Sequence, residues 1–271
     1  MTPRALLEAL PRRWAALPAW TGALIALLSL VLATTLRNPT FIGGENILNV
    51  LRQWSFVGIL ALGMTFVMTL GGIDLSVGSL VAFAGGLGIL VMNTALGAAG
   101  LVTSYEAALG QAGVPLPCGA FRYALSRLFL QLGLAGREGT AVALGFAVIV
   151  ATGLLAGLLH GLLISRGRLA PFIATLGGLA GYRSLALALA NGGEVSSRSP
   201  SLFKAIGTGG IALPGTNLAP QAPVPVPLLV PWPVLVFVVL AVLAHVLLNR
   251  TRYGRYVVAV GCNPRAAAYS A

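Results

Sequence analysis

The chain has 271 residues, of which 57% are hydrophobic and only 8% charged, and its mean hydropathy is +0.91. Since soluble proteins carry about 25% charged residues, this composition excludes a soluble globular protein and predicts an all-α, polytopic membrane protein. The net charge of +11 comes mainly from arginines at the ends of apolar runs, which indicates membrane topology and argues against a nucleic-acid partner.

Six stretches are apolar enough to cross a bilayer as α-helices, which takes about 20 residues each. In chain order they cover residues 19–36, 47–70, 77–97, 140–164, 170–190 and 228–248. A signal peptide is the alternative for the first stretch, but no small-x-small cleavage pattern follows it. We therefore predict about six transmembrane helices in one domain, residues 1–271.

The arginines predict that both termini lie in the cytoplasm. In that orientation the inside segments hold nine arginines and two acidic residues, whereas the outside segments hold six arginines, one lysine and four acidic residues. The bias is clearest in the short loop 165–168 and in the tail, where the positive-inside rule is strongest. Cys118 and Cys262 then lie on opposite sides and are not expected to pair.

Two long connections, 98–139 and 191–227, join the predicted helices on the outside. The first contains apolar residues at helical spacing between Phe121 and Leu132, which predicts either an interfacial amphipathic helix or a plain loop helix. The second is rich in proline and glycine, which predicts a stiff, extended approach to the sixth helix.

Small residues and two polar side chains mark the fourth and fifth stretches. Glycines repeat every four residues, and helix packing is the preferred interpretation of Gly153, Gly157, Gly161, Gly177 and Gly181. A lone buried histidine such as His160 is more often a packed core residue than a ligand. Arg183 lies in the middle of its stretch, where it must face a structural partner or a water-filled path rather than lipid.

The motif GGIDLSVGS, residues 71–79, joins the second and third stretches. One interpretation is a short turn in which Asp74 or Ser76 caps the third helix. However, the turn lacks the basic residues expected of a cytoplasmic loop, and the glycine pair predicts a helix break near 71–78. Irregular backbone at membrane depth is tolerated where it lines a cavity, so Asp74 and Ser76 are candidate path residues.

Enzymatic chemistry is not predicted. Neither His160 nor His245 has a second ligand at metal-binding spacing, and the only lysine, Lys204, is not part of a phosphate-binding loop. The chain therefore carries no predicted catalytic residues, metal or cofactor, and any ATP hydrolysis must come from another subunit.

Three segments resemble, in order, the signatures of one family. GGIDLSVGS resembles the motif of the monosaccharide permeases of bacterial ABC importers, of the ribose, xylose and galactose type. Residues 169–196 are similar to the second signature of that family, and residues 251–271 to its cytoplasmic coupling segment. The sequence around Arg183 and the enlarged connection 98–139 look most like the D-xylose branch. His160 replaces a residue that is commonly asparagine in the family.

The resemblance implies a subunit of the bacterial inner membrane that moves a monosaccharide, such as the pentose D-xylose, by alternating access. The implied partners are an ATPase subunit, a periplasmic sugar-binding protein, a second permease subunit in a homodimer, and the lipid bilayer. Path residues would be Asp74, Ser76, His160 and Arg183. ATPase coupling would involve Gly254, Gly261, Asn263, Ala266, Ala267 and Ser270. Since the family commonly has about ten spans, the chain is expected to be truncated at its C-terminus.

The tail also carries a prediction of its own. Asn263 is a good N-cap, Pro264 fits a first helical turn, and three alanines follow, which predicts a short helix from Asn263. The alternative function is an ion- or proton-coupled secondary transporter, in which Asp74 would bind the proton and no ATPase would take part. Such transporters often contain inverted repeats, and the sequence has no clear internal repeat.

Overall fold

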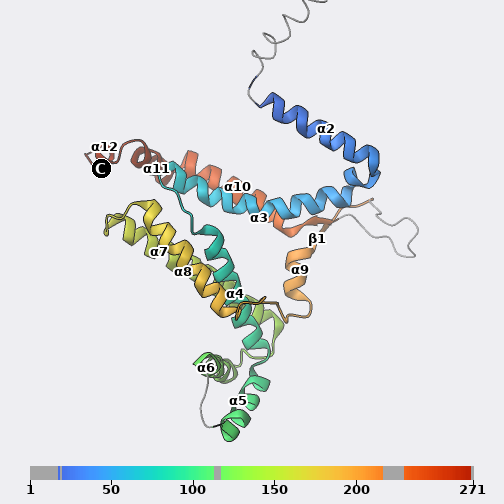
Figure 1. Ribbon diagram of the computed structural model, residues 1–271, viewed down its shortest axis with the longest axis vertical. Helices are drawn as coiled ribbons and strands as arrows, with labels where there is room; N and C mark the ends of the chain where they lie inside the picture. Colours follow the sequence, from blue (N-terminus) through green and yellow to red (C-terminus); the bar gives the residue numbers. More distant parts are fainter. Residues whose placement is uncertain (1–17, 19, 113–116, 216–228, 270–271) are drawn as a thin grey trace, which may run out of the picture. The chain divides into compact units, whose positions relative to one another are not determined.

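The computed structural model describes residues 18, 20–112, 117–215 and 229–269, and these are mainly helical (Figure 1). The chain divides into two compact units. The first contains residues 1–51 and 214–228, and the second contains residues 52–213 and 229–271.

The described part of the first unit holds the helix α2 (Thr21–Arg37), the 3-10 turn η1 (Pro39–Ile42) and the start of α3 (Gly44–Thr69). The Asn38 side chain accepts a hydrogen bond from the Thr40 amide at 3.2 Å and so caps η1. α2 covers the first predicted span closely, but at 17 residues it is shorter than the other apolar helices.

The second unit contains the rest of α3 and most of the remaining chain. Its other elements are α4 (Val77–Leu96), α5 (Ala98–Ala112), α6 (Pro117–Gln131), α7 (Glu138–Ser165), α8 (Pro171–Leu189), α9 (Leu202–Thr208), β1 (Gly210–Ala212), β2 (Leu229–Pro231), α10 (Trp232–Arg250), α11 (Arg252–Cys262) and α12 (Pro264–Tyr269).

Within the described ranges, five helices are long and apolar enough to cross a membrane: α3, α4, α7, α8 and α10. Each begins and ends within a few residues of a predicted stretch, and together with α2 they confirm a mostly helical, polytopic membrane protein. Large apolar side chains such as Leu154 and Leu158 on α7 are exposed in the isolated chain, as expected for helices surrounded by lipid.

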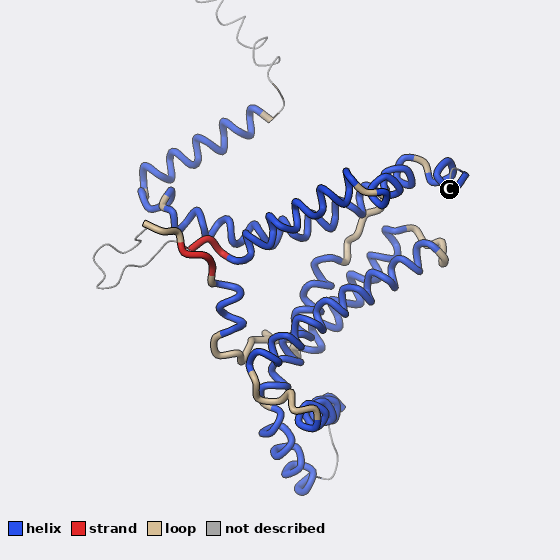
Figure 2. Tube along the Cα trace, turned by 180° about the vertical axis from the view of Figure 1, so that it is seen from behind, coloured by secondary structure: helices blue, strands red, loops and turns tan. Residues whose placement is uncertain are grey.

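The core of the second unit forms where α4 packs between α7 and α8, and Figures 1 and 2 show the three helices side by side. α4 and α7 approach most closely at Gly88 and Gly145, because a side chain at either position would meet the other helix's backbone. Next to this contact, a cluster of buried residues comprises Val91, Met92, Ala95, Phe129, Ala141 and Val142.

The packing prediction for the repeated glycines is wrong within this chain. A Cβ atom at Gly153, Gly157, Gly161, Gly177 or Gly181 would have no neighbour within 4 Å. Close helix contacts instead involve Gly88, Gly145 and, as described below, Gly178. The spacing of glycines identifies a helix face that carries only small residues. It does not show whether a neighbouring helix packs against that face.

The two long connections are more ordered than predicted. The first forms α5 and α6, and α6 buries Phe129 in the core, so this face of the predicted amphipathic helix packs against protein. The second contains α9 and β1, and β1 pairs antiparallel with β2 at the start of the predicted sixth span, with Ile211 opposite Val230 (red in Figure 2). The prediction of an extended approach falls partly on residues 216–228, which lie outside the described residues.

Candidate functional site

The predicted helix break is present between α3 and α4. α3 ends at Thr69, and Gly71 follows with a φ angle of +81°, a conformation that favours glycine. The Gly71 amide donates to the Met68 carbonyl and the Gly72 amide to the Val67 carbonyl, which is the hydrogen-bond pattern of a Schellman motif. The glycine pair therefore stops the second predicted span, as its sequence indicated.

Asp74 and Ser76 form a hydrogen-bonded pair inside this break. One Asp74 carboxylate oxygen, Oδ1, accepts from both the Ser76 amide at 2.8 Å and the Ser76 hydroxyl at 2.7 Å. Ser76 occupies the N-cap position of α4 with no exposed surface, yet its side chain makes no capping bond to the helix. The capping interpretation is thus wrong in detail, because Asp74 organises the turn before the helix.

Three residues of α7 and α8 lie against this turn. His160 is buried, and its imidazole lies against Gly178, where a Cβ atom would come within 2.5 Å of the His160 Nε2 and 3.1 Å of the Ser76 Cβ. On the same helix as Gly178, the Thr175 hydroxyl donates to the Ile73 carbonyl at 3.1 Å. We refer to Asp74, Ser76, His160, Thr175 and Gly178 as the break cluster.

The break cluster also contacts an aromatic residue. The His160 and Tyr182 ring centroids are 5.7 Å apart at an angle of 60°, and Tyr182 stacks in turn on Phe83 of α4. His160 is therefore a packed residue at the junction of three helices. No group of three metal-binding side chains occurs among the residues that the structure describes.

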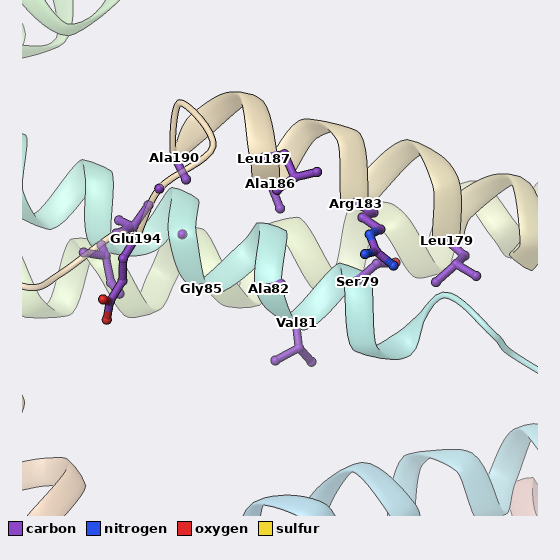
Figure 3. A pocket seen from close by; sticks show the side chains of 14 residues that line it. Ser79, Val81, Ala82, Gly85, Leu179, Arg183, Ala186, Leu187, Ala190 and Glu194 are labelled. Carbon is purple, nitrogen blue, oxygen red and sulfur yellow. The ribbon is translucent and has the colours of Figure 1, made fainter.

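A groove runs along α4 and α8 and is shown in Figure 3. Its volume is about 630 Å³, and we call it the α4–α8 groove. Ser79 of α4 and Arg183 of α8 line one end, Glu194 lines the other, and the walls between them are mainly apolar. The structure thus places Arg183 in the groove and outside the break cluster, where it is exposed in the isolated chain.

A smaller pocket shares Ala190, Glu194 and Val195 with this groove. We call it the loop pocket, since the segment after α8 forms one of its walls. Its volume is about 230 Å³, and its polar lining comprises Asn93, Arg122, Glu194, Ser196 and Arg198. The loop pocket is therefore adjacent to the groove.

Two polar side chains that the sequence analysis did not single out hold the segment after α8. The Asn93 amide group donates to the Ser196 carbonyl and accepts from the Arg198 amide, both at 2.8 Å. The Glu138 carboxylate accepts from the Ser199 and Ser201 hydroxyls and from the Ser201 and Leu202 amides at the start of α9. The sequence shows that Glu138 is an acidic residue at the start of a predicted helix, but it could not reveal these partners, which lie over 60 positions further along the chain.

The tail forms two short helices. α11 packs closely against its neighbours, because a Cβ atom at Gly254 would collide with the Leu248 carbonyl and one at Gly261 with the Thr69 carbonyl at the end of α3. The predicted helix after Asn263 is confirmed as α12: the Asn263 side chain accepts from the Arg265 and Ala266 amides at 3.1 Å each. Ala266 and Ala267 lie in α12, whereas Ser270 is outside the described residues.

Residues 46–271 match the family described as the branched-chain amino acid transport system / permease component. The chain belongs to this permease family. The predictions of a multi-pass membrane protein and of a transport component rather than an enzyme are thereby confirmed.

Curated relatives of the chain are sugar permeases by name. It is 31% identical to the ribose import permease protein RbsC of Bacillus subtilis over 92% of this chain and 59% of the relative. It is 30% identical to the galactofuranose transporter permease protein YtfT of Escherichia coli, over 95% and 60% respectively. It is 28% identical to the xylose transport system permease protein XylH of Haemophilus influenzae, over 85% of this chain and 62% of the relative.

The chain spans about 60% of the length of these relatives. No solved structure matches it. The groove shares three lining residues with the loop pocket, and at its other end it is lined by Ser79, whose hydroxyl donates to the Ser76 carbonyl of the break cluster at 2.8 Å.

Proposed function

We propose that the chain is the membrane-spanning permease subunit of an ATP-binding-cassette importer for a monosaccharide. The observation that carries this proposal is the α4–α8 groove, which has polar residues at both ends, in a chain similar to sugar permeases. α4 has 20 residues and so extends about 30 Å, which is the thickness of the hydrocarbon layer. A groove along it offers a neutral solute a way past the lipid.

The relatives favour a pentose as the substrate. The names of the relatives with 29–31% identity include several ribose permeases, and the xylose permease stands at 28%. We therefore propose D-ribose as the first substrate to test, while the D-xylose assignment stays a prediction.

Asp74, Ser76 and His160 would act together as a moving part of the path. Ser76 and His160 are buried within the break cluster, so a sugar reaches these two side chains only when α4, α7 and α8 shift. Ser79 and Arg183 offer hydrogen-bonding groups on the groove wall without such a shift. Alternating access would then open the groove at one end and close it at the other.

The tail would transmit the state of the ATPase to the break. Gly261 touches the Thr69 carbonyl, two residues before the glycine at which α3 stops. A force on α11 or α12 therefore reaches the break cluster through one backbone contact. Gly254, Asn263, Ala266, Ala267 and Ser270 would shape the segment that the ATPase grips, with a periplasmic binding protein and a second permease subunit completing the importer.

Reconstitution tests this function. The permease, made together with its ATPase and binding protein, is placed in liposomes, and the uptake of radiolabelled D-ribose is measured with and without ATP. We expect uptake to require ATP and the binding protein and to persist when an ionophore removes the proton gradient. Uptake that needs the gradient but not ATP would support the secondary-transporter alternative.

Cysteine labelling tests the proposed orientation, with both termini in the cytoplasm. An impermeant thiol reagent added outside intact cells should label Cys118 and spare Cys262, which is exposed in the structure. Labelling of Cys262 alone would reverse the orientation.

A further inference from the structure

We infer that the loop pocket is a binding subsite for a neutral polyhydroxylated ligand, such as a monosaccharide, separate from the break cluster. The inference rests on the proposed function for the identity of the ligand, but its argument comes from the pocket. Asn93 and Ser76 are 17 residues apart in sequence, so the two sites are separated by about 25 Å along α4.

The pocket is held in shape without a ligand. Asn93 uses both ends of its amide group to fix the backbone at Ser196 and Arg198. Glu138 fixes the next residues of the same segment through the hydroxyl of Ser199 and the amide of Ser201. Because side chains from two helices already fix this segment, it loses little conformational entropy when a ligand binds, as expected of a preformed site.

Arg122 provides an unused donor on the opposite wall. It belongs to α6, and its Nε atom is shielded from solvent but donates no hydrogen bond within the part of the chain that the structure describes. Buried donors in folded proteins are nearly always bonded, so an exception calls for an explanation. Arg122 lines the loop pocket and also a neighbouring pocket between α5 and α6, and its guanidinium group is therefore a candidate donor to a ligand hydroxyl in the loop pocket.

The charges of the lining select the class of ligand. Arg122 and Arg198 donate hydrogen bonds only, whereas the Glu194 carboxylate only accepts them. The lining thus carries both signs of charge, so neither a cation nor an anion interacts favourably with all three groups. A sugar hydroxyl donates and accepts at once, so neighbouring hydroxyls satisfy both kinds of group without adding charge.

The position of the pocket explains what such a subsite would do. The loop pocket shares three lining residues with the α4–α8 groove, so a ligand held there lies next to the groove. Whereas the groove walls are mainly apolar, the loop pocket offers a sugar several hydrogen bonds before it enters them. The subsite would capture the sugar at the mouth of the groove.

Binding to the purified chain, in lipid nanodiscs without ATPase or binding protein, tests this inference. D-ribose binding is measured by saturation-transfer NMR, which detects weak ligands, in the wild type and in Arg122→Ala. We expect the affinity to fall about tenfold, as for loss of one charge-assisted hydrogen bond. The matched control is Arg127→Ala, since Arg127 lies on the same helix but pairs with Tyr123 outside the pocket. It should bind like the wild type.

Two further measurements keep the test decisive. Arg122→Gln retains a donor and much of the side-chain volume, so it should bind with intermediate affinity even if Arg122→Ala folds poorly. D-ribose should also slow hydrogen exchange at residues 195–198 in the wild type, and ribose 5-phosphate should bind no more tightly than D-ribose, because Glu194 opposes its negative charge. Equal binding by Arg122→Ala and wild type, no binding by the wild type, or tighter binding of the phosphate would each overturn the inference.

Failure of the subsite and failure of the proposed function give different results. Uptake driven by ATP with no dependence of binding on Arg122 would reject the subsite and keep the importer. Binding that depends on Arg122 in a protein whose uptake ignores ATP would keep the subsite and reject the importer.

Discussion

The two ends of α4 use polar residues in opposite ways. At the break end, the Asp74 Oδ1 accepts two hydrogen bonds from Ser76, Ser76 has no exposed surface, and the His160 ring lies against Gly178. At the loop end, the Asn93 side chain bonds only backbone groups, which leaves the side chains of Glu194, Ser196 and Arg198 exposed around a pocket.

The difference indicates that the polar groups at the break end fix the position of the helices, whereas those at the loop end are available to bind a ligand. Polar groups that bond one another keep those hydrogen bonds only in one arrangement of the helices, so the bonds change when a helix moves. Exposed donors and acceptors can instead form hydrogen bonds to a ligand. If both ends contribute to transport, substitutions at the break end should lower the rate of uptake, and substitutions at the loop end should weaken binding.

The largest effect is expected for Asp74→Asn. Asparagine keeps an oxygen that can accept from the Ser76 amide and hydroxyl, but it removes the negative charge from the break. If charge at this depth is functional, uptake should fall about 100-fold while expression stays near normal. Uptake with unchanged kinetics would show that Asp74 only shapes the turn, since asparagine organises turns equally well. Radiolabelled sugar uptake by the reconstituted importer decides between these.

A second, smaller effect is expected for Gly178→Ala. The new methyl group would press on the His160 ring, and overpacking of this kind costs about 1–3 kcal/mol. The thermal midpoint of the protein in detergent should fall, and uptake about tenfold with it. Gly177→Ala is the matched control, because a Cβ atom there has no neighbour within 4 Å. It should leave both quantities unchanged.

A double substitution shows whether the Gly178→Ala effect comes from His160. In a His160→Ala background the ring is gone, so adding Gly178→Ala should cost much less than it does alone. Strictly additive effects on the thermal midpoint would mean that the contact between His160 and Gly178 does not determine the geometry of the break cluster.

The break end was largely predictable from the sequence, because its signals are local. Gly71 and Gly72 stop one helix, Ser76 precedes the next, and apolar runs on both sides set the helix lengths within a few residues. The sequence analysis named Arg183 as a path residue together with Asp74, Ser76 and His160, but it could not tell whether Arg183 lies beside the break or along the groove. Whether a residue on α8 faces the break or the groove depends on the rotation of α8 about its axis.

The loop end was not predictable, because its contacts join distant segments. Asn93 and Ser196 are 103 positions apart, and Glu138 and Ser201 are 63 apart, so no periodicity or short motif reports the pairing. The pairing of β1 with β2 has the same origin. The open faces at Gly153 and Gly157 show the converse, since a sequence can display small residues at regular spacing where the chain itself packs nothing.

The contact between the tail and the break end gives a third prediction. Gly261→Ala would place a methyl group against the Thr69 carbonyl, which forces α11 away from the end of α3. We expect uptake per ATP hydrolysed to fall about fivefold, with ATPase binding preserved. Cys262→Ala changes the neighbouring exposed residue and should have no effect. Gly261→Ala with normal coupling would mean that this contact does not carry the signal.

Ala267 tests the surface that would meet the ATPase. In a protein that assembles with its ATPase, Ala267→Cys should form crosslinks to that subunit, and Ala267→Glu should separate ATP hydrolysis from sugar uptake. The comparison variant is Ala99→Glu, at an exposed position at the start of α5. If Ala267→Glu leaves assembly and uptake intact, the coupling role of α12 is wrong.

The smallest effect is expected for Glu138→Gln at the loop end. Glutamine keeps an oxygen that can accept from the Ser201 and Leu202 amides at the start of α9, but it lacks the negative charge that strengthens these hydrogen bonds. Charge-assisted hydrogen bonds are roughly twice as strong as neutral ones, so the segment should loosen without unfolding. Hydrogen exchange at residues 199–203 should rise about threefold, with little change at residues 72–76. Glu106→Gln is the matched control, because Glu106 accepts from Tyr123 in the hairpin of α5 and α6 instead. A comparable rise in hydrogen exchange at residues 72–76 would show that the two ends of α4 are mechanically coupled. The separate roles of the two ends, helix positioning and ligand binding, would then be wrong.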